Sequence, residues 1–505
     1  MSNSNNNRRI FKNTLFLYFR MLLTLGVTLY TSRVVLNSLG VEDFGIFNVV
    51  GGVVTMMAFL SGAMSSATQR FFSFELGKNN LEQLAKVFKM SLNIHWLIVL
   101  IVVLVAQTLG LWFVNNQLVI PPERLVAANW VFQCALFSFC CSVLSVPYNA
   151  AIISYEKMSA FAYISIVDVF LKLTVVFLLA EHAGDKLQFY ALLLAALSLL
   201  ILGCYYAYAR WQFTVTRFSW YWNTELFKIL FSYTGWNLFG NVAAVATNQG
   251  INILLNLFFG ATVNAARAIS FQVNSAITGF VTSLQISINP QIVKSYASDN
   301  HTYMHQLIMG GSKYAFFLLY ALALPILLQT ETVLTLWLVN PPEYTALFCQ
   351  LVLVDALITS LSGSLMASVQ ATGNIKRYQA VIGGILLLNL PLSYLALSNG
   401  GGAHTVFYVS IGTSITALLF RFVLLKELIN LKVTQFFSKV IGRSLVVVLF
   451  TFLPLSLITL STGNLVIDFI LMSALIVTFT AMAIFMLGLE KFERDFIKAR
   501  IHKFL

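Results

Sequence analysis

Long apolar segments with few charges dominate this chain and limit what it can fold into. Only 10% of its 505 residues are charged, against roughly a quarter in soluble domains. A helix needs about 20 apolar residues to cross a bilayer. Fourteen segments reach that length, and they lie near residues 11–38, 44–74, 88–114, 124–153, 157–180, 187–211, 225–258, 262–293, 310–339, 344–371, 377–398, 403–425, 440–460 and 465–488.

These segments predict an all-α integral membrane protein. Long uninterrupted apolar runs favour helices over a transmembrane barrel, whose strands alternate apolar and polar residues. All five cysteines fall inside predicted spans and lack the spacing of metal ligands. We therefore interpret the cysteines as packing residues, and we expect neither a disulfide framework nor a bound metal or cofactor.

The distribution of basic residues sets the predicted orientation. The net charge of +12 could by itself suggest a nucleic-acid partner. However, nearly all Lys and Arg residues between the spans fall on the side of the N-terminus, and only Arg124 and Lys186 fall opposite. The positive-inside rule therefore predicts that both termini are cytoplasmic, with the polar segment 2–9 as a retained tail.

An internal repeat predicts how the spans are organised. Pro-Pro-Glu occurs at 121–123 and again at 341–343, and the same offset of 220 residues relates Gly40 to Gly260. It also relates the polar segment ending at Asn80 to the one ending at Asn300. Such a repeat predicts two related bundles that face each other across a cavity, as in transporters. We expect six-helix bundles over 1–212 and 213–428, followed by two additional helices and a basic tail over 429–505.

Polar stripes on two predicted spans mark candidate substrate-binding residues, because polar groups facing lipid are costly. At the helical period, one stripe on the span 225–258 contains Asn237, Asn241, Asn248 and Asn252. A second stripe on the span 262–293 contains Arg267, Asn274 and Gln285. Interhelical hydrogen bonds would explain one or two such residues per helix. We therefore expect both stripes to line a hydrated cavity.

Other charged residues inside the spans complete the candidate site. Arg20 lies on the polar stripe of the first span and is the best candidate for a cavity cation, whereas Arg70 either snorkels or lines the inner vestibule. Asp168 and Lys172 are i, i+4 partners, which suggests a self-neutralising pair or an ion-coupling switch. Asp355 is a further candidate for ion coupling and has no evident local partner.

No catalytic constellation stands out in the sequence. Hydrolases and transferases need clustered carboxylates, a nucleophile with its base, or a phosphate loop. The six histidines are scattered, and the glycines at 400–402 are not followed by Lys-Ser/Thr. We therefore expect a protein that is not an enzyme.

Two short motifs carry a family resemblance. They are Leu-Gly-Val-Glu-Asp-Phe-Gly-Ile-Phe at 39–47 and Ser-Ser-Ala-Thr-Gln-Arg at 65–70. With them the chain resembles the Wzx-type polysaccharide and O-antigen repeat-unit flippases, in the multidrug/oligosaccharidyl-lipid/polysaccharide (MOP) exporter superfamily. The resemblance implies alternating access between two six-helix bundles in the bacterial cytoplasmic (inner) membrane. The implied cargo is an undecaprenyl-diphosphate-linked oligosaccharide. Membrane lipids, H⁺ or Na⁺ and other polysaccharide-assembly proteins are the further partners it suggests, and nucleic acid is not among them.

The sign of the candidate charges favours this anionic cargo. Arginine suits phosphate, and amides suit sugar hydroxyls. The main alternative is a multidrug cation antiporter, which relies on acids embedded in the first or the seventh span. The first span has no acid, and none occurs between Glu225 and Gly260. A lipid II-type flippase of the same superfamily also stays open.

Overall fold

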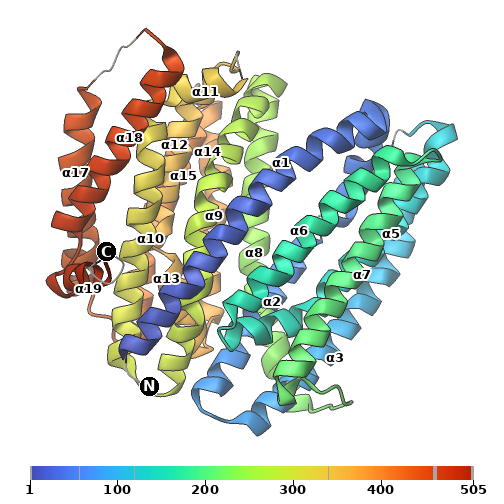
Figure 1. Cartoon of the computed structure of the whole chain (residues 1–505), viewed down its shortest axis with the longest axis horizontal. Coiled ribbons are helices and arrows are strands. Elements are labelled where there is room, and N and C mark those ends of the chain that lie inside the picture. The colour runs from blue at the N-terminus through green and yellow to red at the C-terminus, as the bar shows by residue number, and fades with distance from the viewer. Residues whose placement is uncertain (1–2, 56, 119, 339, 459–462, 502–505) are drawn as a thin grey trace. The chain divides into compact units, whose positions relative to one another are not determined.

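The computed structural model describes residues 3–55, 57–118, 120–338, 340–458 and 463–501, and helices account for nearly all of them (Figure 1). No strand occurs in these described ranges. The last residues of the predicted basic tail, 502–505, lie outside them. The prediction of an all-α protein is therefore confirmed.

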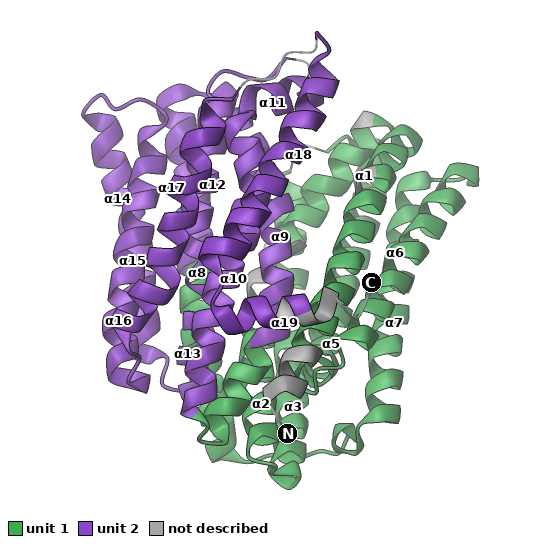
Figure 2. Cartoon of the chain, turned by 60° about the vertical axis from the view of Figure 1, so that its left-hand side comes forward, with its two compact units in different colours: residues 1–242, 289–300 green, residues 243–288, 301–505 purple. Residues whose placement is uncertain are grey.

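The chain divides into two compact units, which Figure 2 colours separately. Unit 1 comprises residues 1–242 and 289–300. Its elements are α1 (Asn3–Thr55), α2 (Ala58–Gly77), α3 (Leu81–Val105), η1 (Ala106–Gly110), α4 (Leu111–Asn116), η2 (Pro122–Arg124), α5 (Leu125–Ser154), α6 (Met158–Glu181), α7 (Lys186–Gln212), η3 (Thr214–Thr216) and the first half of α8 (Thr224–Phe259).

Unit 2 comprises residues 243–288 and 301–505. It contains the second half of α8 and most of α9 (Ala261–Ala297), whose last turns belong to unit 1. Its other elements are α10 (His301–Leu328), α11 (Thr330–Leu338), α12 (Thr345–Ser360), α13 (Gly363–Thr372), α14 (Lys376–Ser398), α15 (Thr405–Ile429), α16 (Val433–Phe436), η4 (Phe437–Gly442), α17 (Arg443–Ser456), α18 (Leu465–Ala483), η5 (Ile484–Gly488) and α19 (Lys491–Ile501).

Twelve helical segments of the described chain are long and apolar enough to cross a membrane. The predicted spans 44–74 and 262–293 are not among them. The first is divided between the end of α1 and α2, and the second corresponds to α9, whose polar residues lower its hydropathy. In their described residues both are nevertheless helical, so all fourteen predicted segments fall on helices of a multi-pass membrane protein.

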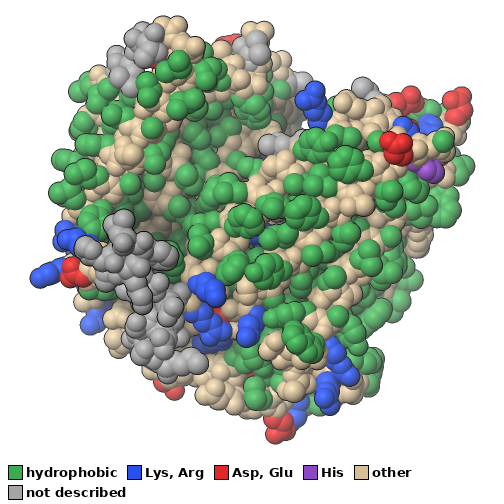
Figure 3. Space-filling model, viewed as in Figure 1, with side chains coloured by type: hydrophobic (Ala, Val, Ile, Leu, Met, Phe, Trp, Pro, Cys, Tyr) green, Lys and Arg blue, Asp and Glu red, His purple; other side chains and the backbone are tan. Residues whose placement is uncertain are grey.

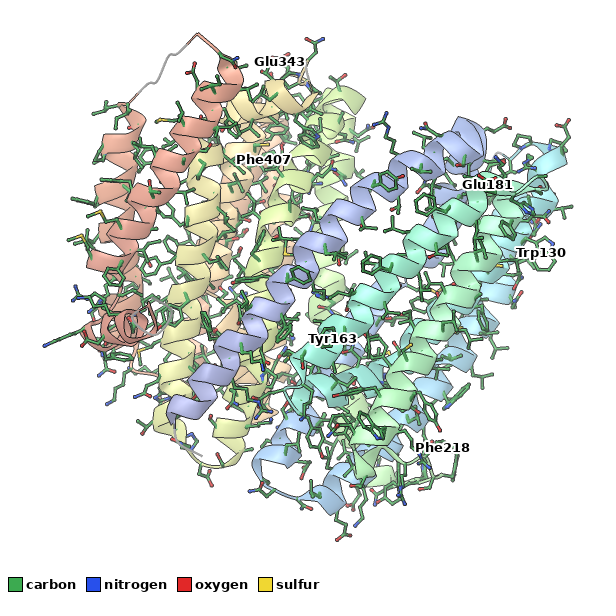
Figure 4. All side chains as sticks on the ribbon, viewed as in Figure 1. Trp130, Tyr163, Glu181, Phe218, Glu343 and Phe407 are labelled. Atoms are coloured by element: carbon green, nitrogen blue, oxygen red, sulfur yellow. The ribbon has the colours of Figure 1, made fainter. Side chains whose placement is uncertain are left out.

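The outer surface of the helices matches a lipid environment. In the face shown in Figure 3, hydrophobic side chains cover most of the length of the helices. Leu100 and Leu104 of α3, for example, are 56% and 58% exposed. In unit 1, most of the visible Lys and Arg residues gather at the end where α2 meets α3. Figure 4 places Glu181 and Phe218 at opposite ends of this unit.

The core of unit 1 forms where α5 packs against its neighbours. The strongest helix pairs are α5 with α7 and α1 with α6, and Figure 1 shows α5, α6 and α7 side by side. Val131 and Phe132 of α5 are 1% exposed and pack with Val50 of α1 and Leu187 of α7. All five cysteines are free thiols, and Cys134 lies in this core.

In unit 2 the core surrounds α10. Leu319, Ala323 and Leu324 of α10 have no exposed surface. The same cluster includes Val447 of α17 and Ile476 of α18. The two helices that we predicted as additional to the repeat therefore pack directly on the central helix of unit 2.

Matching positions of the repeat share a positive φ angle. Gly40 has φ 79° and its repeat counterpart Gly260 has φ 81°. Asn79 and Asp299 form a second matched pair, with φ values of 53° and 55° in the turns that follow α2 and α9. Positive φ at matching positions indicates that both copies use the same turns, and glycine is the residue that adopts φ near 80° without strain.

A guanidinium joins three elements at one end of unit 1. Arg124 of η2 pairs with Asp43 of α1 and, at 2.9 Å, with Asp185, whose carboxylate also caps α7. Partial burial favours the protonated carboxyl of Asp185. This effect of burial is smaller than the combined effect of the hydrogen bonds from backbone N–H groups and the pairing with Arg124, which favour the charged carboxylate. The pKa of Asp185 therefore lies below its ordinary value.

Replacing the repeat glycines should destabilise the protein. Gly40 has ψ 170° as well as positive φ, a region that essentially only glycine occupies. We expect Gly40→Ala to lower the free energy of unfolding by about 1–3 kcal/mol and Gly260→Ala to act in the same direction. Thermal unfolding of the purified protein in detergent measures both.

Gly203→Ala is the matched control for these glycine variants. It lies within α7, and an added Cβ would meet no atom within 4 Å. Alanine also favours a helix over glycine. Its melting temperature should be unchanged or slightly higher. Equal melting temperatures for all three variants would contradict the assignment of special turns.

Candidate functional site

A cavity of about 660 Å³ lies inside unit 1. Its walls come from the second half of α1 and from α5, α6 and α7. Many of the polar wall residues carry hydroxyl or amide groups: Asn48, Ser138, Ser142, Ser145, Asn149, Ser165 and Ser198. Phe47, Phe139 and Tyr205 add aromatic surface. The volume falls within the roughly 300–1,000 Å³ of small-molecule sites.

One face of α5 supplies the polar floor of this cavity. Ser138, Ser142, Ser145 and Asn149 are spaced by four, three and four residues, which places them on one side of a helix. The sequence analysis did not identify this stripe because serine is common and inexpensive inside helices. Its spacing is the signal that could have revealed it.

The predicted pair Asp168 and Lys172 lies in the wall of the same cavity. Lys172 Nζ is 2.8 Å from Asp168 Oδ2 on α6, so the pair forms as expected for i, i+4 partners. The two charges cancel locally. An ion-coupling role for either residue stays a prediction.

Arg20 of α1 lies beside this cavity. Its guanidinium stacks over the ring of Phe161 of α6, with Cζ 4.8 Å from the ring centroid. It also interacts electrostatically with Tyr205, a residue of the cavity wall. Its Nε is buried without a hydrogen-bond partner, and no carboxylate of the described residues lies within ion-pair distance. Arg20 is therefore a cation whose charge is not neutralised by an acid.

Arg70 occupies a separate aromatic site in unit 1. Its guanidinium lies 4.6 Å from the ring centroid of Phe71 and 5.6 Å from that of Tyr233 in α8. Tyr233 in turn hydrogen-bonds Asn237. Asn241 lies one turn further along α8, against α2 at Gly62. The structure thus places the predicted residues Arg70, Asn237 and Asn241 at one packing surface between α2 and α8.

A buried polar cluster in unit 2 surrounds Arg267. This side chain donates hydrogen bonds to Oδ1 of Asn252 (2.5 Å) and to Oδ1 of Asn248 (3.0 Å), and it stacks on Phe271 at 4.2 Å. Arg267 is only 5% exposed. Its Nε has no partner, and no acid in the described ranges is within ion-pair distance. Three predicted residues therefore meet in one cluster.

The other predicted residues of unit 2 have different partners from those of Arg267. Asn274 has a buried Oδ1 without a partner, and Gln285 packs against Gly363 at the start of α13. Asp355 of α12 hydrogen-bonds Ser414 of α15. Each predicted stripe is therefore divided into separate clusters, because packing changes partners along helices of 36 and 37 residues.

The sequence analysis missed a buried acid, Glu156. It lies in the turn between α5 and α6 and is only 3% exposed. Its carboxylate binds Lys294 at 2.5 Å, Gln291 at 2.6 Å and Arg9 at 3.3 Å. This cluster joins the start of α1 and the end of α9 to the α5–α6 turn. Glu156 is more than 100 residues away from each of these partners in the chain, so no local pattern could reveal the cluster.

Comparisons with known proteins identify the fold. No protein-family model matches the chain, and no match is found among curated sequences. Among solved structures, a MATE protein in the bent conformation aligns with a TM-score of 0.73 at 13% identity, over 84% of this chain and 96% of that one. An outward-facing multidrug resistance MATE transporter of the MOP superfamily aligns with a TM-score of 0.69 at 15% identity, over 83% and 96%.

A MOP superfamily transporter from Pyrococcus furiosus aligns equally well. Its TM-score is 0.70 at 12% identity, over 83% of this chain and 96% of that one. The binding pocket of that transporter is reported to have reverse polarity, which suggests a different function for it. The present chain therefore has the helical membrane fold of the MATE and related MOP transporters. The fold that the sequence resemblance implied is confirmed.

Removing the buried acid should strongly destabilise unit 1. Glu156→Ala leaves Lys294 without its carboxylate partner, and breaking a buried ion pair typically costs about 3–5 kcal/mol. We expect a clear drop in melting temperature or in the yield of folded protein. Glu82→Ala is the control, because Glu82 pairs with Lys86 on an exposed surface and should leave the melting temperature nearly unchanged. Similar behaviour of the two variants would contradict the role of Glu156.

Proposed function

We propose that the protein is an alternating-access transporter that flips an undecaprenyl-diphosphate-linked oligosaccharide to the outer leaflet. The observation that carries this proposal is the environment of Arg267. It is buried, it is held by the amide oxygens of Asn248 and Asn252, and no acid in the described chain is close enough to neutralise it.

The physics of a buried guanidinium explains why this observation points to an anionic cargo. Burying a charge without an opposite charge is unfavourable, and amide oxygens reduce the penalty while leaving the positive charge in place. Evolution retains such a group inside a membrane mainly where it has a function. A diphosphate would supply the missing negative charge, and the planar guanidinium can bind its oxygens in pairs.

Arg20 provides the same type of group in unit 1. It stacks on Phe161 and also lacks an acid within ion-pair distance among the described residues. Each unit therefore has its own cation for a phosphate group, with amide or hydroxyl groups nearby. Arg70, Asn274 and Gln285 are retained as further candidate contacts to this cargo.

The structural neighbours support the transport part of the proposal. Two of the neighbours reported above are named as transporters, and one of these two connects reversed pocket polarity with a different function. We further propose location in the bacterial cytoplasmic membrane with both termini inside, H⁺ or Na⁺ as coupling ion, and polysaccharide-assembly proteins as partners.

The second candidate is a cation antiporter, and Asp168 is the observation in its favour. Its carboxylate lies in the cavity wall of unit 1, where it could bind a cationic drug or a coupling proton. Lys172 at 2.8 Å already neutralises it, which favours the anionic cargo. Asp355 stays a candidate for ion coupling under either function. A lipid II-type flippase would share the anionic headgroup and differ only in the sugar.

The test compares arginine variants in a bacterial strain whose own copy of the gene is deleted. Arg267→Ala and Arg20→Ala should each reduce surface glycan, because losing one charge-assisted interaction of about 1.5–3 kcal/mol weakens binding by roughly tenfold or more. Arg267→Lys should retain part of the activity. Arg33→Ala on the exposed side of α1 is the matched control and should behave as wild type.

Two outcomes would contradict the proposal. Normal surface glycan in both alanine variants at equal protein level would remove the arginines from the mechanism. Ion-driven efflux of cationic dyes from vesicles, with no effect on glycan export, would favour the antiporter.

A further inference from the structure

The cavity of unit 1 has the chemistry of a sugar-binding site. We infer that it holds the uncharged saccharide residues of the cargo, beside the diphosphate contact at Arg20. This inference rests on the proposed function. It extends that function, because the cavity lies outside the polar stripes of 225–258 and 262–293 that were predicted to bind substrate.

Charge is the first argument. The charged groups in the cavity wall are Asp168 and Lys172, and they neutralise each other at 2.8 Å. The cavity therefore presents no net charge to a ligand. A phosphate would find no free cation there and an organic cation no free acid, whereas a neutral polyol needs neither.

Hydrogen-bonding capacity is the second argument. Ser145, Ser165 and Ser198 each donate their hydroxyl hydrogen to a backbone carbonyl of their own helix, at 2.7, 2.9 and 2.9 Å, and Ser165 also hydrogen-bonds Tyr205. Asn48 likewise donates its amide to Phe44 O at 2.7 Å. These groups keep oxygen lone pairs for a ligand. The wall is therefore rich in acceptors, which suit the O–H donors of a sugar and not the oxygens of a phosphate.

Asn149 is the most informative member of the wall. Its Oδ1 is buried and has no hydrogen-bond partner among the described residues. Buried polar atoms are rarely left unpaired, so an atom of this kind in a cavity wall indicates a missing donor. A sugar hydroxyl would supply that donor.

Size and position complete the argument. A volume of about 660 Å³ has room for a short oligosaccharide, and Phe47, Phe139 and Tyr205 offer apolar surface to the faces of sugar rings. Tyr205 also interacts with Arg20. The cation and the cavity are therefore neighbours within one unit, as a sugar linked directly to a diphosphate requires.

The experiment measures binding of three probes to the purified full-length protein in nanodiscs. The probes are an undecaprenyl diphosphate without sugar, the same lipid carrying a short neutral oligosaccharide, and that oligosaccharide alone. Wild type should bind the glycolipid more tightly than the bare lipid. Asn149→Leu should weaken glycolipid binding about tenfold, the loss expected for one buried unpaired polar group, and leave binding of the bare lipid unchanged.

Further variants separate the cavity from the headgroup contact. Arg20→Ala should weaken both lipids, because it acts on the diphosphate. Ser142→Val, at an exposed position on the same face of α5, tests the cavity independently if Asn149→Leu does not fold. Asn116→Leu, an exposed amide on α4 outside the cavity, is the control and should change neither affinity.

The possible results are distinguishable. Bare-lipid binding with no gain from the sugar, or equal losses for both lipids in the cavity variants, would overturn the sugar site while the flippase proposal stands. Binding of free oligosaccharide without either lipid would support the cavity and overturn the flippase proposal. Binding of none of the three probes would overturn both.

Discussion

The absence of water from the bilayer interior is the constraint on which this structure depends. Backbone groups must then be paired within their own segment, which leaves helices as the only elements that this sequence can use to cross. The same constraint decides where charges are placed. Glu156 is surrounded by two cations and an amide, Lys172 neutralises Asp168, and Arg124 is shared by two acids. Against this background of local compensation, Arg20 and Arg267 stand out.

Much of the fold could be predicted from the sequence, because hydrophobicity and length act locally along each helix. The described residues of all fourteen predicted segments are mostly helical, and Gly40 and Gly260 share a positive φ angle as their repeat positions suggest. Arg70 of α2 meets distant α8 beside Tyr233, but the predicted residues of the Arg267 cluster lie on adjacent helices joined by a short turn. Arg267 reaches Asn248 and Asn252 because only Gly260 separates α8 from α9.

What the sequence could not reveal depends on contacts between distant segments. In the sequence, Glu156 resembles any acid in a loop. Its role depends on Arg9 and Lys294, which only the folded chain places beside it. The cavity of unit 1 requires four helices, and α1, α6 and α7 each contribute only one of its serines or asparagines, so only the stripe on α5 has a pattern that the sequence could show. The helical period also predicted that each polar stripe lines one continuous cavity. The stripes are instead divided, because one face of a long helix contacts different neighbours at its two ends.

The course of α8 and α9 has a consequence for dividing the protein into fragments. Both helices begin in one unit and end in the other, so unit 1 includes residues 213–242 and 289–300 in addition to the first repeat. A polypeptide that ends at 212 would lack the partners of Arg70 on α8 and those of Glu156 on α9. The two repeats cannot be treated as interchangeable halves joined by a linker. A fragment that ends at 212 would therefore leave Arg70 without Tyr233 and Glu156 without Gln291 and Lys294.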